Sequence, residues 1–273
     1  MDGADTDNPV NPVRLNRYLA QCGLGSRREC DRLIAAGSVA VNGTTVKELG
    51  TRVDLSRDTV TVAGKRAGRA LPLQYVACHK SRGIMVTAKD PQGRETVYDA
   101  LGKKGFNASH LKYVGRLDRD SEGLLLMTND GDLVHALTHP RFHIKKSYLV
   151  RIERKLLPEH AGQMTGAGVR SNGQTLTAGK VSPRETEGIT GEHWYVVDLY
   201  EGKNRQIRRM FESFGYEIIR LKRTQFGTVK LGSLRRGSYR FLEPREIAGL
   251  RRLGHAGTRT RTGKGKGRGR ADA

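Results

Sequence analysis

A short apolar run, Gly-Leu-Leu-Leu-Met-Thr at residues 123–128, limits the folds that are open to this chain. The run is too short for a membrane-spanning helix, which needs about 20 apolar residues, but it has the length of a buried strand. Further strand-like segments lie at residues 73–80, 147–152, 193–200 and 216–223. Because short helical stretches separate them irregularly, we expect an α+β domain with flanking helices and a mainly antiparallel or mixed sheet.

A different pattern occupies residues 12–64, upstream of that domain. Apolar residues repeat at helical spacing over residues 14–22, and Ser26 with Glu29 forms a capping box that predicts the start of a second helix. The Asn-Gly pair at 42–43 is the strongest short hairpin signal. We therefore expect a small helix–helix–hairpin domain, and its two helices carry Arg14, Arg17, Arg27, Arg28 and Arg32.

Changes in composition predict the remaining boundaries. Residues 1–11 are acidic and lack the apolar stretch of a secretory signal, so we expect a flexible N-terminus. Residues 65–70 are basic and contain glycine, which predicts a linker before a second domain over residues 71–250. Residues 251–273 are rich in Lys, Arg and Gly and nearly lack apolar side chains, which predicts a disordered basic tail.

The chain is strongly basic, with 49 Lys and Arg residues against 28 Asp and Glu residues and a formal net charge of +21. Self-repulsion at that level destabilises a compact chain, so we expect a polyanionic partner. Most of the excess charge lies in the folded part, so the tail alone does not explain it. Since aromatic residues make up only 6% and no membrane anchor is present in the sequence, nucleic acid is favoured over a membrane surface.

The common cofactor and metal motifs are missing from the sequence. It contains no GxxxxGK[ST] phosphate loop, no GxGxxG dinucleotide motif and no HExxH pair, and its three cysteines lack metal-ligand spacing. We therefore expect no cofactor, no metal and reduced thiols in a cytoplasmic protein. Carboxylates, tyrosines and arginines remain as the groups that could do chemistry.

The densest candidate for chemistry is the charged loop that runs into the apolar strand, Gly-Arg-Leu-Asp-Arg-Asp-Ser-Glu at residues 115–122. Within it Asp118 is flanked by Arg116 and Arg119. A nearby opposite charge favours an ionised carboxylate, which a nucleophile or base requires. From the residue types alone a second interpretation stays open, in which Asp118 only pairs with an arginine in a loop.

Residues 115–131 strongly resemble the catalytic motif of RNA pseudouridine synthases, in the branch that modifies ribosomal RNA. Other segments resemble motifs of the same family in the same order: residues 14–43 its S4 RNA-binding domain, 137–150 its tyrosine motif and 201–223 its arginine-rich motif. The S4 domain, the segment Leu-Gly-Ser-Leu-Arg-Arg-Gly-Ser-Tyr-Arg-Phe-Leu and the basic tail together are most similar to the branch that acts on the large ribosomal subunit.

This resemblance implies roles for individual residues. Asp118 matches the essential aspartate, the nucleophile in breaking and remaking the glycosidic bond. Tyr148 matches the tyrosine that stacks on the target uracil, and Leu221 matches an apolar residue that packs against the same ring. Arg116 is expected to help hold the nucleotide outside the helix. The alternation of residues 148–152 is compatible with an inward-facing tyrosine, and an ordinary core tyrosine is the alternative.

The arginine motif has a similar division of roles. By resemblance Arg208 pairs with the catalytic Asp118. On a helix that starts near Asn204, Arg208 falls at the edge of the apolar stripe, a position that suits a partly buried ion pair. A plain phosphate contact is the alternative for this residue. Arg205 and Arg209 lie opposite the stripe and are expected to contact phosphates.

Two positions depart from the family pattern. Ser121 stands where many relatives have Thr and keeps the hydroxyl group. Ser81 stands where Pro usually follows the Lys80 position, so the shape of that loop is expected to differ.

The resemblance implies isomerisation of uridine to pseudouridine in ribosomal RNA, most directly 23S rRNA. The N1–C1′ bond lies inside the RNA stack, so the nucleotide has to be extruded before it reacts. The same reaction on 16S rRNA is one alternative, and a non-catalytic S4-type assembly factor that binds rRNA is another. We expect a monomer that acts on rRNA or a pre-ribosomal particle and does not associate with a membrane.

Overall fold

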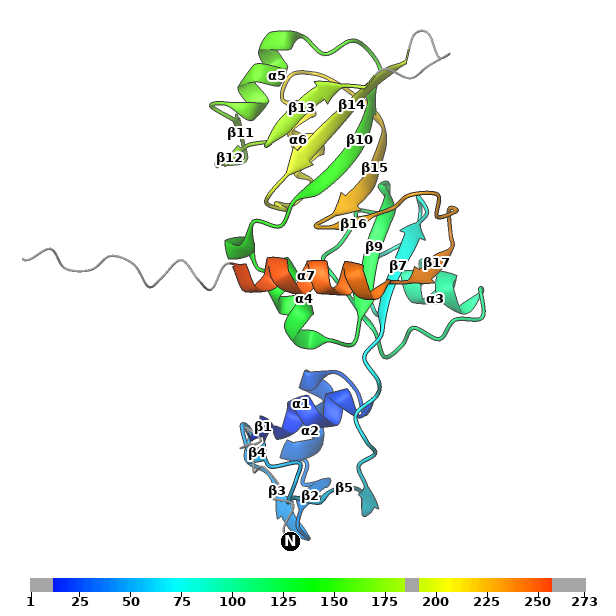
Figure 1. Cartoon of the computed structure of the whole chain (residues 1–273), viewed down its shortest axis with the longest axis vertical. Coiled ribbons are helices and arrows are strands. Elements are labelled where there is room, and N and C mark those ends of the chain that lie inside the picture. The colour runs from blue at the N-terminus through cyan, green and yellow to red at the C-terminus, as the bar shows by residue number, and fades with distance from the viewer. Residues whose placement is uncertain (1–11, 185–191, 257–273) are drawn as a thin grey trace, which may run out of the picture. The chain divides into compact units, whose positions relative to one another are not determined.

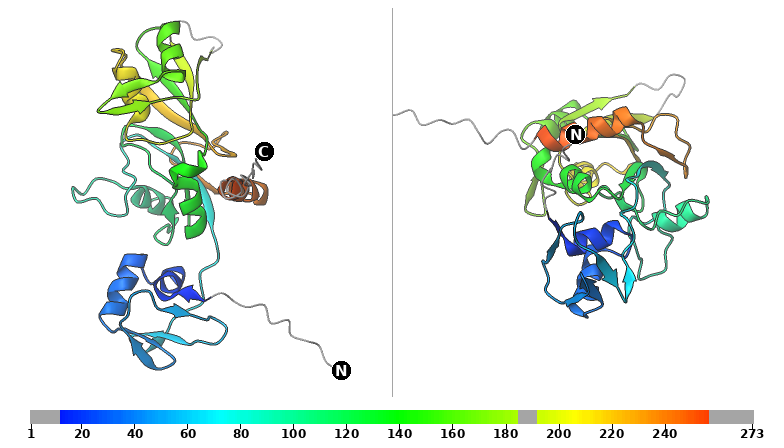
Figure 2. Two further views of the ribbon diagram at one scale, coloured as in Figure 1. Left: turned by 90° about the vertical axis from the view of Figure 1, so that its left-hand side faces the viewer. Right: turned by 60° about the horizontal axis from the view of Figure 1, so that its bottom comes forward.

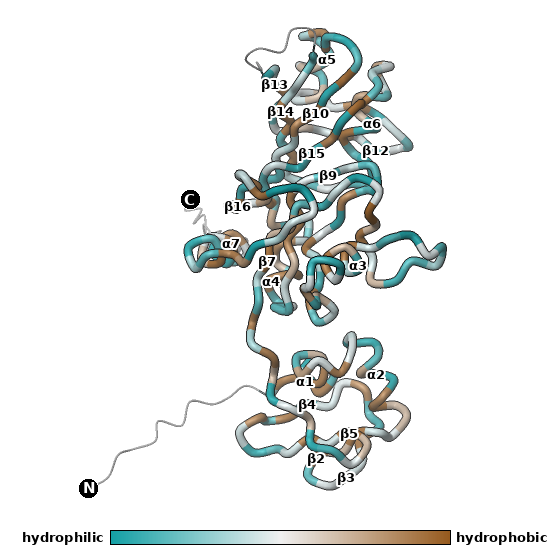
Figure 3. Tube along the Cα trace, turned by 90° about the vertical axis from the view of Figure 1, so that its right-hand side faces the viewer, coloured by the Kyte–Doolittle hydropathy of each residue, from teal (hydrophilic) through white to brown (hydrophobic). Residues whose placement is uncertain are grey.

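The computed structural model describes residues 12–184 and 192–256, which divide into two compact units at residues 73 and 74 (Figure 1). The segment expected to be a flexible N-terminus, residues 1–11, and most of the expected tail lie outside the described residues. No helix in the two described ranges is long and apolar enough to cross a bilayer. Hydrophobic and hydrophilic residues alternate along both units (Figure 3), and each unit has its own buried core.

The N-terminal unit has the helix–helix–hairpin order that the sequence predicts. The Ser26 hydroxyl accepts a hydrogen bond from the backbone N–H of Glu29 at 3.3 Å, and the Glu29 carboxylate accepts one from the backbone N–H of Ser26 at 2.6 Å. This capping box starts the second helix, as expected. The elements are β1 (Val13–Arg14), α1 (Leu15–Gln21), α2 (Arg27–Ala35), β2 (Val39–Val41), β3 (Thr44–Val46), β4 (Arg52–Val53), β5 (Val60–Val62) and β6 (Lys65–Arg66).

The expected linker at residues 65–70 is wrong at its start. Lys65 and Arg66 form β6, which pairs with β5. Ala63 and Gly64 both have positive φ, so the chain reverses in a tight turn and returns as a strand instead of leaving the unit. A basic, apolar-poor segment therefore joins a sheet here through its main chain alone.

The second unit is built on a nine-stranded mixed sheet with the order β13-β14-β10-β15-β9-β7-β17, and β8 and β16 pair beside this path. Within this sheet β9 and β15 pair in parallel, and the other described pairs are antiparallel. Its strands are β7 (Tyr75–Lys80), β8 (Lys112–Tyr113), β9 (Glu122–Thr128), β10 (Lys146–Ile152), β13 (Lys180–Pro183), β14 (His193–Leu199), β15 (Ile218–Phe226), β16 (Val229–Lys230) and β17 (Tyr239–Phe241).

Helices and a small hairpin complete this unit. They are α3 (Val97–Gly102), α4 (Gly131–Thr138), a short 3-10 helix (Pro140–Phe142), α5 (Pro158–Thr165), the hairpin of β11 (Val169–Ser171) and β12 (Gln174–Leu176), α6 (Gln206–Glu212) and α7 (Pro244–Ala256). The mixed α+β architecture that the sequence predicts is confirmed.

The apolar run forms the buried strand β9, as predicted, and all seven of its residues are buried. Leu125 and Met127 pack on the side of the sheet that carries α3 and α6. Leu124 and Leu126 pack on the other side, where α4 and α7 lie side by side (Figure 2). A strand segment covered on both faces buries apolar side chains on both sides, which explains why residues 124–127 lack the usual alternation.

The expected start of the tail at residue 251 is also wrong. Helix α7 continues to Ala256, and Leu253 packs against the same core as Leu250. The two leucines are three residues apart and therefore share one helix face. The few apolar residues beyond position 250 are enough to extend the helix across the sheet by further turns.

The two antiparallel parts of the sheet meet where β9 runs beside β15. Glu122 pairs with Lys222 there, and Gly123 pairs with Arg223. Gly123 has a φ of +109°, and a Cβ atom at this position would lie 2.2 Å from the carbonyl oxygen of Arg223 and 2.6 Å from its nitrogen. Both atoms belong to the main chain and cannot rotate away. Only glycine fits this seam, the parallel pairing of β9 with β15 at residues 122–123 and 222–223.

Replacing Gly123 with Ala is therefore expected to lower the free energy of unfolding by at least ~2 kcal/mol, because backbone strain and a main-chain clash add up. Urea unfolding of the purified protein measures this change. Gly131→Ala is the matched control, since no atom lies within 4 Å of its Cβ position. A Gly123→Ala protein as stable as the Gly131→Ala control would contradict this account of the seam.

Candidate active site

The residues that the sequence singles out for catalysis and substrate binding lie together around one cavity of about 90 Å³. Its lining includes Arg116, Asp118, Tyr148, Arg208 and Leu221. They come from the loop before β9, from β10, from α6 and from β15. The convergence of four elements that are far apart in the chain makes this cavity the candidate active site.

Tyr148 and Leu221 form the apolar part of the cavity. Tyr148 is only 9% exposed and belongs to the same core cluster as Leu221, which is 5% exposed. Their strands β10 and β15 are neighbours, with Val150 opposite Leu221 and a register shift between Ser147 and Tyr148. As expected from the strand pattern, the tyrosine faces inward, and it borders the cavity as well as the core.

The buried ammonium group of Lys80 holds the loop that carries Asp118. Lys80 lies on β7 and is 3% exposed. Its Nζ donates to the carbonyl oxygens of Ser81 and Asp118 at 3.0 Å, of Arg119 at 3.2 Å and of Ser121 at 2.7 Å. Burial lowers the pKa of Lys80 to about 8, while Asp118 and Asp120 oppose this shift.

The sequence pointed to Lys80 only through the missing proline after it. The carbonyl groups that surround its Nζ come mostly from the loop about 40 residues further along the chain, so no local pattern could show this contact. The Lys80 ammonium group fixes the main chain of the Asp118 loop through carbonyl oxygens and does not bond to the Asp118 carboxylate. Lys80 is therefore a positioning residue for the loop.

Arg208 does not form the expected direct ion pair with Asp118 among the described residues. Its Nη2 donates instead to the carbonyl oxygen of Asp120 at 3.3 Å, and its buried Nε has no hydrogen-bond partner. Burial and the neighbouring Arg205 lower the pKa of the Arg208 guanidinium, while Asp118 and Asp120 oppose the shift. The guanidinium group thus lies near both carboxylates and keeps unused hydrogen-bonding capacity at the cavity.

The two arginines that flank Arg208 have different surroundings. Arg205 is exposed, lines the cavity and makes a 3.6 Å ion pair with Glu212. Arg209 donates to the Ser171 hydroxyl at 3.1 Å, to the Ser171 carbonyl, to the Gln174 side chain at 3.3 Å and to the Asn204 carbonyl at 3.3 Å. The expectation that Arg209 projects from the helix as a phosphate contact therefore needs correction. Because α6 packs against β11, this guanidinium joins the helix to the hairpin.

The arginines expected to bind RNA in the N-terminal unit lie on or next to α1 and α2. Arg17 is half-buried, and the exposed members are Arg14, Arg27, Arg28 and Arg32. Several positive side chains on two adjacent helices form a surface that suits a phosphate backbone.

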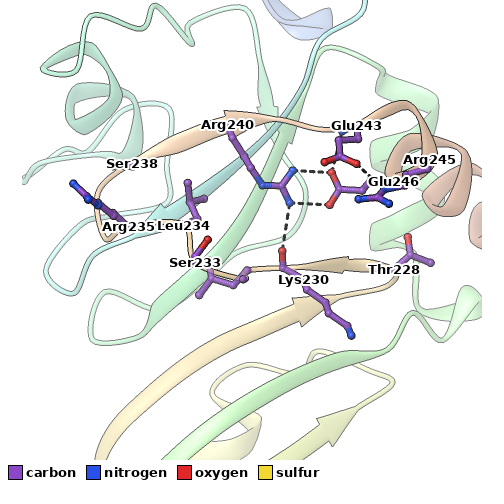
Figure 4. Close-up of a pocket in the computed structure, with 12 residues that line it drawn as sticks. Thr228, Lys230, Ser233, Leu234, Arg235, Ser238, Arg240, Glu243, Arg245 and Glu246 are labelled. Carbon is purple, nitrogen blue, oxygen red and sulfur yellow. Dashed lines mark hydrogen bonds and ion pairs between the residues drawn. The ribbon is translucent and has the colours of Figure 1, made fainter.

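A larger cavity of about 800 Å³ lies beside β16 and β17, and none of the predicted catalytic residues lines it (Figure 4). Its charges are largely paired within the protein. Both guanidinium Nη atoms of Arg240 lie 2.7 Å from the Glu246 carboxylate, and Arg245 pairs with Glu243 at 2.6 Å. We therefore assign no chemistry to this cavity despite its size.

Comparison with known proteins matches the chain to two family models. The S4 domain matches residues 13–67, and the family described as RNA pseudouridylate synthase matches residues 74–213. The ribosomal large subunit pseudouridine synthase B of Bacillus subtilis is 36% identical over 250 residues, which is 89% of this chain and 98% of the relative. An uncharacterized RNA pseudouridine synthase of Mycobacterium tuberculosis is 38% identical, over 87% of this chain and 92% of the relative.

A crystal structure of a pseudouridylate synthase has the same fold. It aligns with a TM-score of 0.58 at 27% sequence identity and covers 87% of this chain and 99% of that protein. The similarity therefore spans both units of the chain.

Replacing Lys80 with Met is expected to lower the free energy of unfolding at pH 7 by about 1–3 kcal/mol, because buried carbonyl groups lose their donor. This gap should widen as the pH rises from about 8 to about 10.4. In that range folded Lys80 has lost its proton and unfolded Lys80 still holds it, so the wild type gains a contribution to stability that Lys80→Met lacks. Urea unfolding at several pH values measures both effects.

Lys112→Met is the matched control, because Lys112 is exposed on β8 of the same sheet. It should change stability little at every pH. A gap between the wild type and Lys80→Met that narrows above pH 8 would contradict the burial of this ammonium group.

Proposed function

The chain belongs to the RNA pseudouridylate synthase family, and from this we propose that it converts a uridine of 23S ribosomal RNA to pseudouridine with Asp118 as the nucleophile. The observation that carries the proposal is the convergence of Arg116, Asp118, Tyr148, Arg208 and Leu221 on one cavity. Similar proteins that are named ribosomal large subunit pseudouridine synthases support rRNA of the large subunit as the substrate.

The reaction rearranges one nucleotide and needs no external group. The N1–C1′ bond breaks, the uracil ring turns and the C5–C1′ bond forms. The hydrogen on C5 leaves as a proton and N1 takes one up, so the product is an isomer of the substrate. The Asp118 carboxylate acts as the nucleophile while the glycosidic bond is broken and remade. Since the hydrogen bonds from Lys80 hold only the main chain of this loop, the carboxylate is free to face the substrate.

The remaining lining residues hold the extruded base and its charge. Tyr148 stacks on the uracil ring, and Leu221 packs against it in the apolar part of the cavity. Arg208 supplies a positive charge close to Asp118, and its unpartnered Nε is available to substrate oxygens. Arg116 and Arg205 are exposed beside the cavity, where they contact the RNA backbone.

Binding of the rest of the RNA is assigned to the N-terminal unit. Arg14, Arg17, Arg27, Arg28 and Arg32 provide positive charge on or next to its two helices. A non-catalytic assembly factor would need this surface but would have no use for the cavity around Asp118. We therefore prefer the enzyme.

Asp118→Asn is expected to lower the single-turnover rate of pseudouridine formation by about 10³-fold or more, because the amide is a poor nucleophile of nearly the same shape. RNA affinity should change little. Release of tritium from rRNA that carries 5-tritiated uridine measures the rate. Asp120→Asn is the matched control, since Asp120 is exposed and only its carbonyl oxygen contacts Arg208.

Three results would count against this proposal. Asp118→Asn activity within tenfold of the wild type would remove the nucleophile role. Mapping of pseudouridines in rRNA from cells that lack the protein identifies the substrate. One missing pseudouridine in 23S rRNA is the expected result, a missing one in 16S rRNA would change the substrate, and an unchanged map would overturn the proposal.

Replacing Arg27, Arg28 and Arg32 together with Ala should weaken rRNA binding and flatten its dependence on salt. Each lost phosphate contact is expected to reduce the slope of log affinity against log salt by roughly 0.7–0.9. Filter binding at several salt concentrations measures the slope. A slope equal to that of the wild type would mean that these arginines do not contact phosphates.

A further inference from the structure

A second cavity of about 280 Å³ adjoins the candidate active site. The two cavities share the lining residues Arg116, Tyr148, Gly202 and Lys203. Tyr148 therefore borders both spaces. An RNA strand that places its uridine in the first cavity therefore passes directly beside the second cavity.

The second cavity is lined by a buried arginine whose bonding is incomplete. Arg223, on β15, is 2% exposed, and its Nε donates to the Leu124 carbonyl at 2.7 Å. Its guanidinium lies 5.3 Å from the centre of the Phe226 ring, and its Nη1 lies 3.5 Å from the Arg116 carbonyl. Its buried Nη2 has no hydrogen-bond partner. An orphaned buried donor costs about 1–3 kcal/mol, so an acceptor in the cavity would bind well there.

A second cation lies on the neighbouring strand. Lys146, on β10, lines the same cavity, and its Nζ donates to the Ile144 carbonyl at 2.8 Å. An ammonium group carries three donors. Burial and the nearby charge of Arg223 lower the pKa of Lys146 to about 8, and Glu201 opposes this shift. The two cations thus repel each other, and an anion bound by both would relieve the repulsion.

The charge balance of the lining favours an anion over a neutral ligand. Arg116, Lys146, Lys203 and Arg223 contribute four positive charges, and Glu201 contributes the one acidic side chain of the lining. Lys203 lies 3.0 Å from Glu201 and compensates it within the protein. The remaining positive charge has no partner in the cavity lining.

We propose that this second cavity holds the phosphate group of a nucleotide adjoining the target uridine, with Arg223 and Lys146 as its donors. The inference rests on the proposed function, because the same RNA strand has to enter the first cavity. Binding of the adjoining phosphate fixes the direction in which the strand leaves the extruded uridine. The cavity is then a subsite that positions the substrate.

A double-mutant cycle between protein and RNA tests this contact. The RNA is a synthetic rRNA fragment with the mapped uridine, made with an ordinary backbone or with one uncharged methylphosphonate at each of the flanking linkages in turn. The protein is the full chain as wild type or as Lys146→Met, which removes the charge and keeps the length of the side chain. Arg223 is not replaced, because it also holds the main chain of Leu124.

With the wild type, we expect a methylphosphonate at one of the flanking linkages to lower kcat/KM about tenfold. Lys146→Met should lose a similar factor on the ordinary RNA and nothing further on RNA with that methylphosphonate. Lys230→Met, which removes an exposed lysine outside both cavities, should respond to each RNA as the wild type does. Circular dichroism and urea unfolding check that the variants are folded.

The proposal would be overturned if, at every linkage, the loss of kcat/KM from Lys146→Met and the loss from the methylphosphonate simply multiplied. The side chain and the phosphate would then act separately. The same cycle measured on RNA affinity tests the contact without turnover. A wild type that binds the fragment but forms no pseudouridine would disprove the proposed function, while coupling in affinity would still support the phosphate subsite.

Discussion

The close contact between Gly123 and the main chain of Arg223 is the constraint on which the rest of the catalytic unit depends. It allows β9 and β15 to run side by side and so joins the two antiparallel parts of the sheet. The Asp118 loop enters β9 immediately before this point, and Leu221 lies on β15 immediately before it. A side chain at residue 123 would push apart the two strands that bring the nucleophile and the apolar wall of the cavity together.

The electrostatics of the site depend on which groups accept hydrogen bonds from its buried cations. Lys80, Arg208 and Arg223 donate to main-chain carbonyl groups around the loop and form no ion pair with the Asp118 carboxylate. Positive charge is therefore retained around Asp118, where an RNA strand brings negative charge. Glu122 is the contrasting case, since it is fully buried and lies 2.5 Å from Arg220. The buried acid is neutralised inside the protein, and the carboxylate at the cavity is left for substrate.

Local sequence patterns predicted local structure well. The capping box at Ser26, the Asn-Gly hairpin and the buried strand after the charged loop all depend on interactions between residues close in the chain. Predictions based on composition were weaker. Lys65 and Arg66 form a strand, and Leu253 continues a helix, because a partner strand and a neighbouring core supply the contacts that these segments lack by themselves.

The sequence by itself determined the fold class, the family motifs and the residue types around which the cavity forms. The tertiary structure decided what each charged side chain contacts. Helical periodicity places Arg208 and Arg209 on particular faces, but it does not tell which segment packs there. Arg209 bonds to the hairpin, and Lys80 and Arg208 donate to the Asp118 loop. The phosphate subsite proposed at Arg223 is lined by β10, β15 and the loops beside them. Such contacts join residues that are distant in the chain, so they exist only once the sheet has brought its strands together.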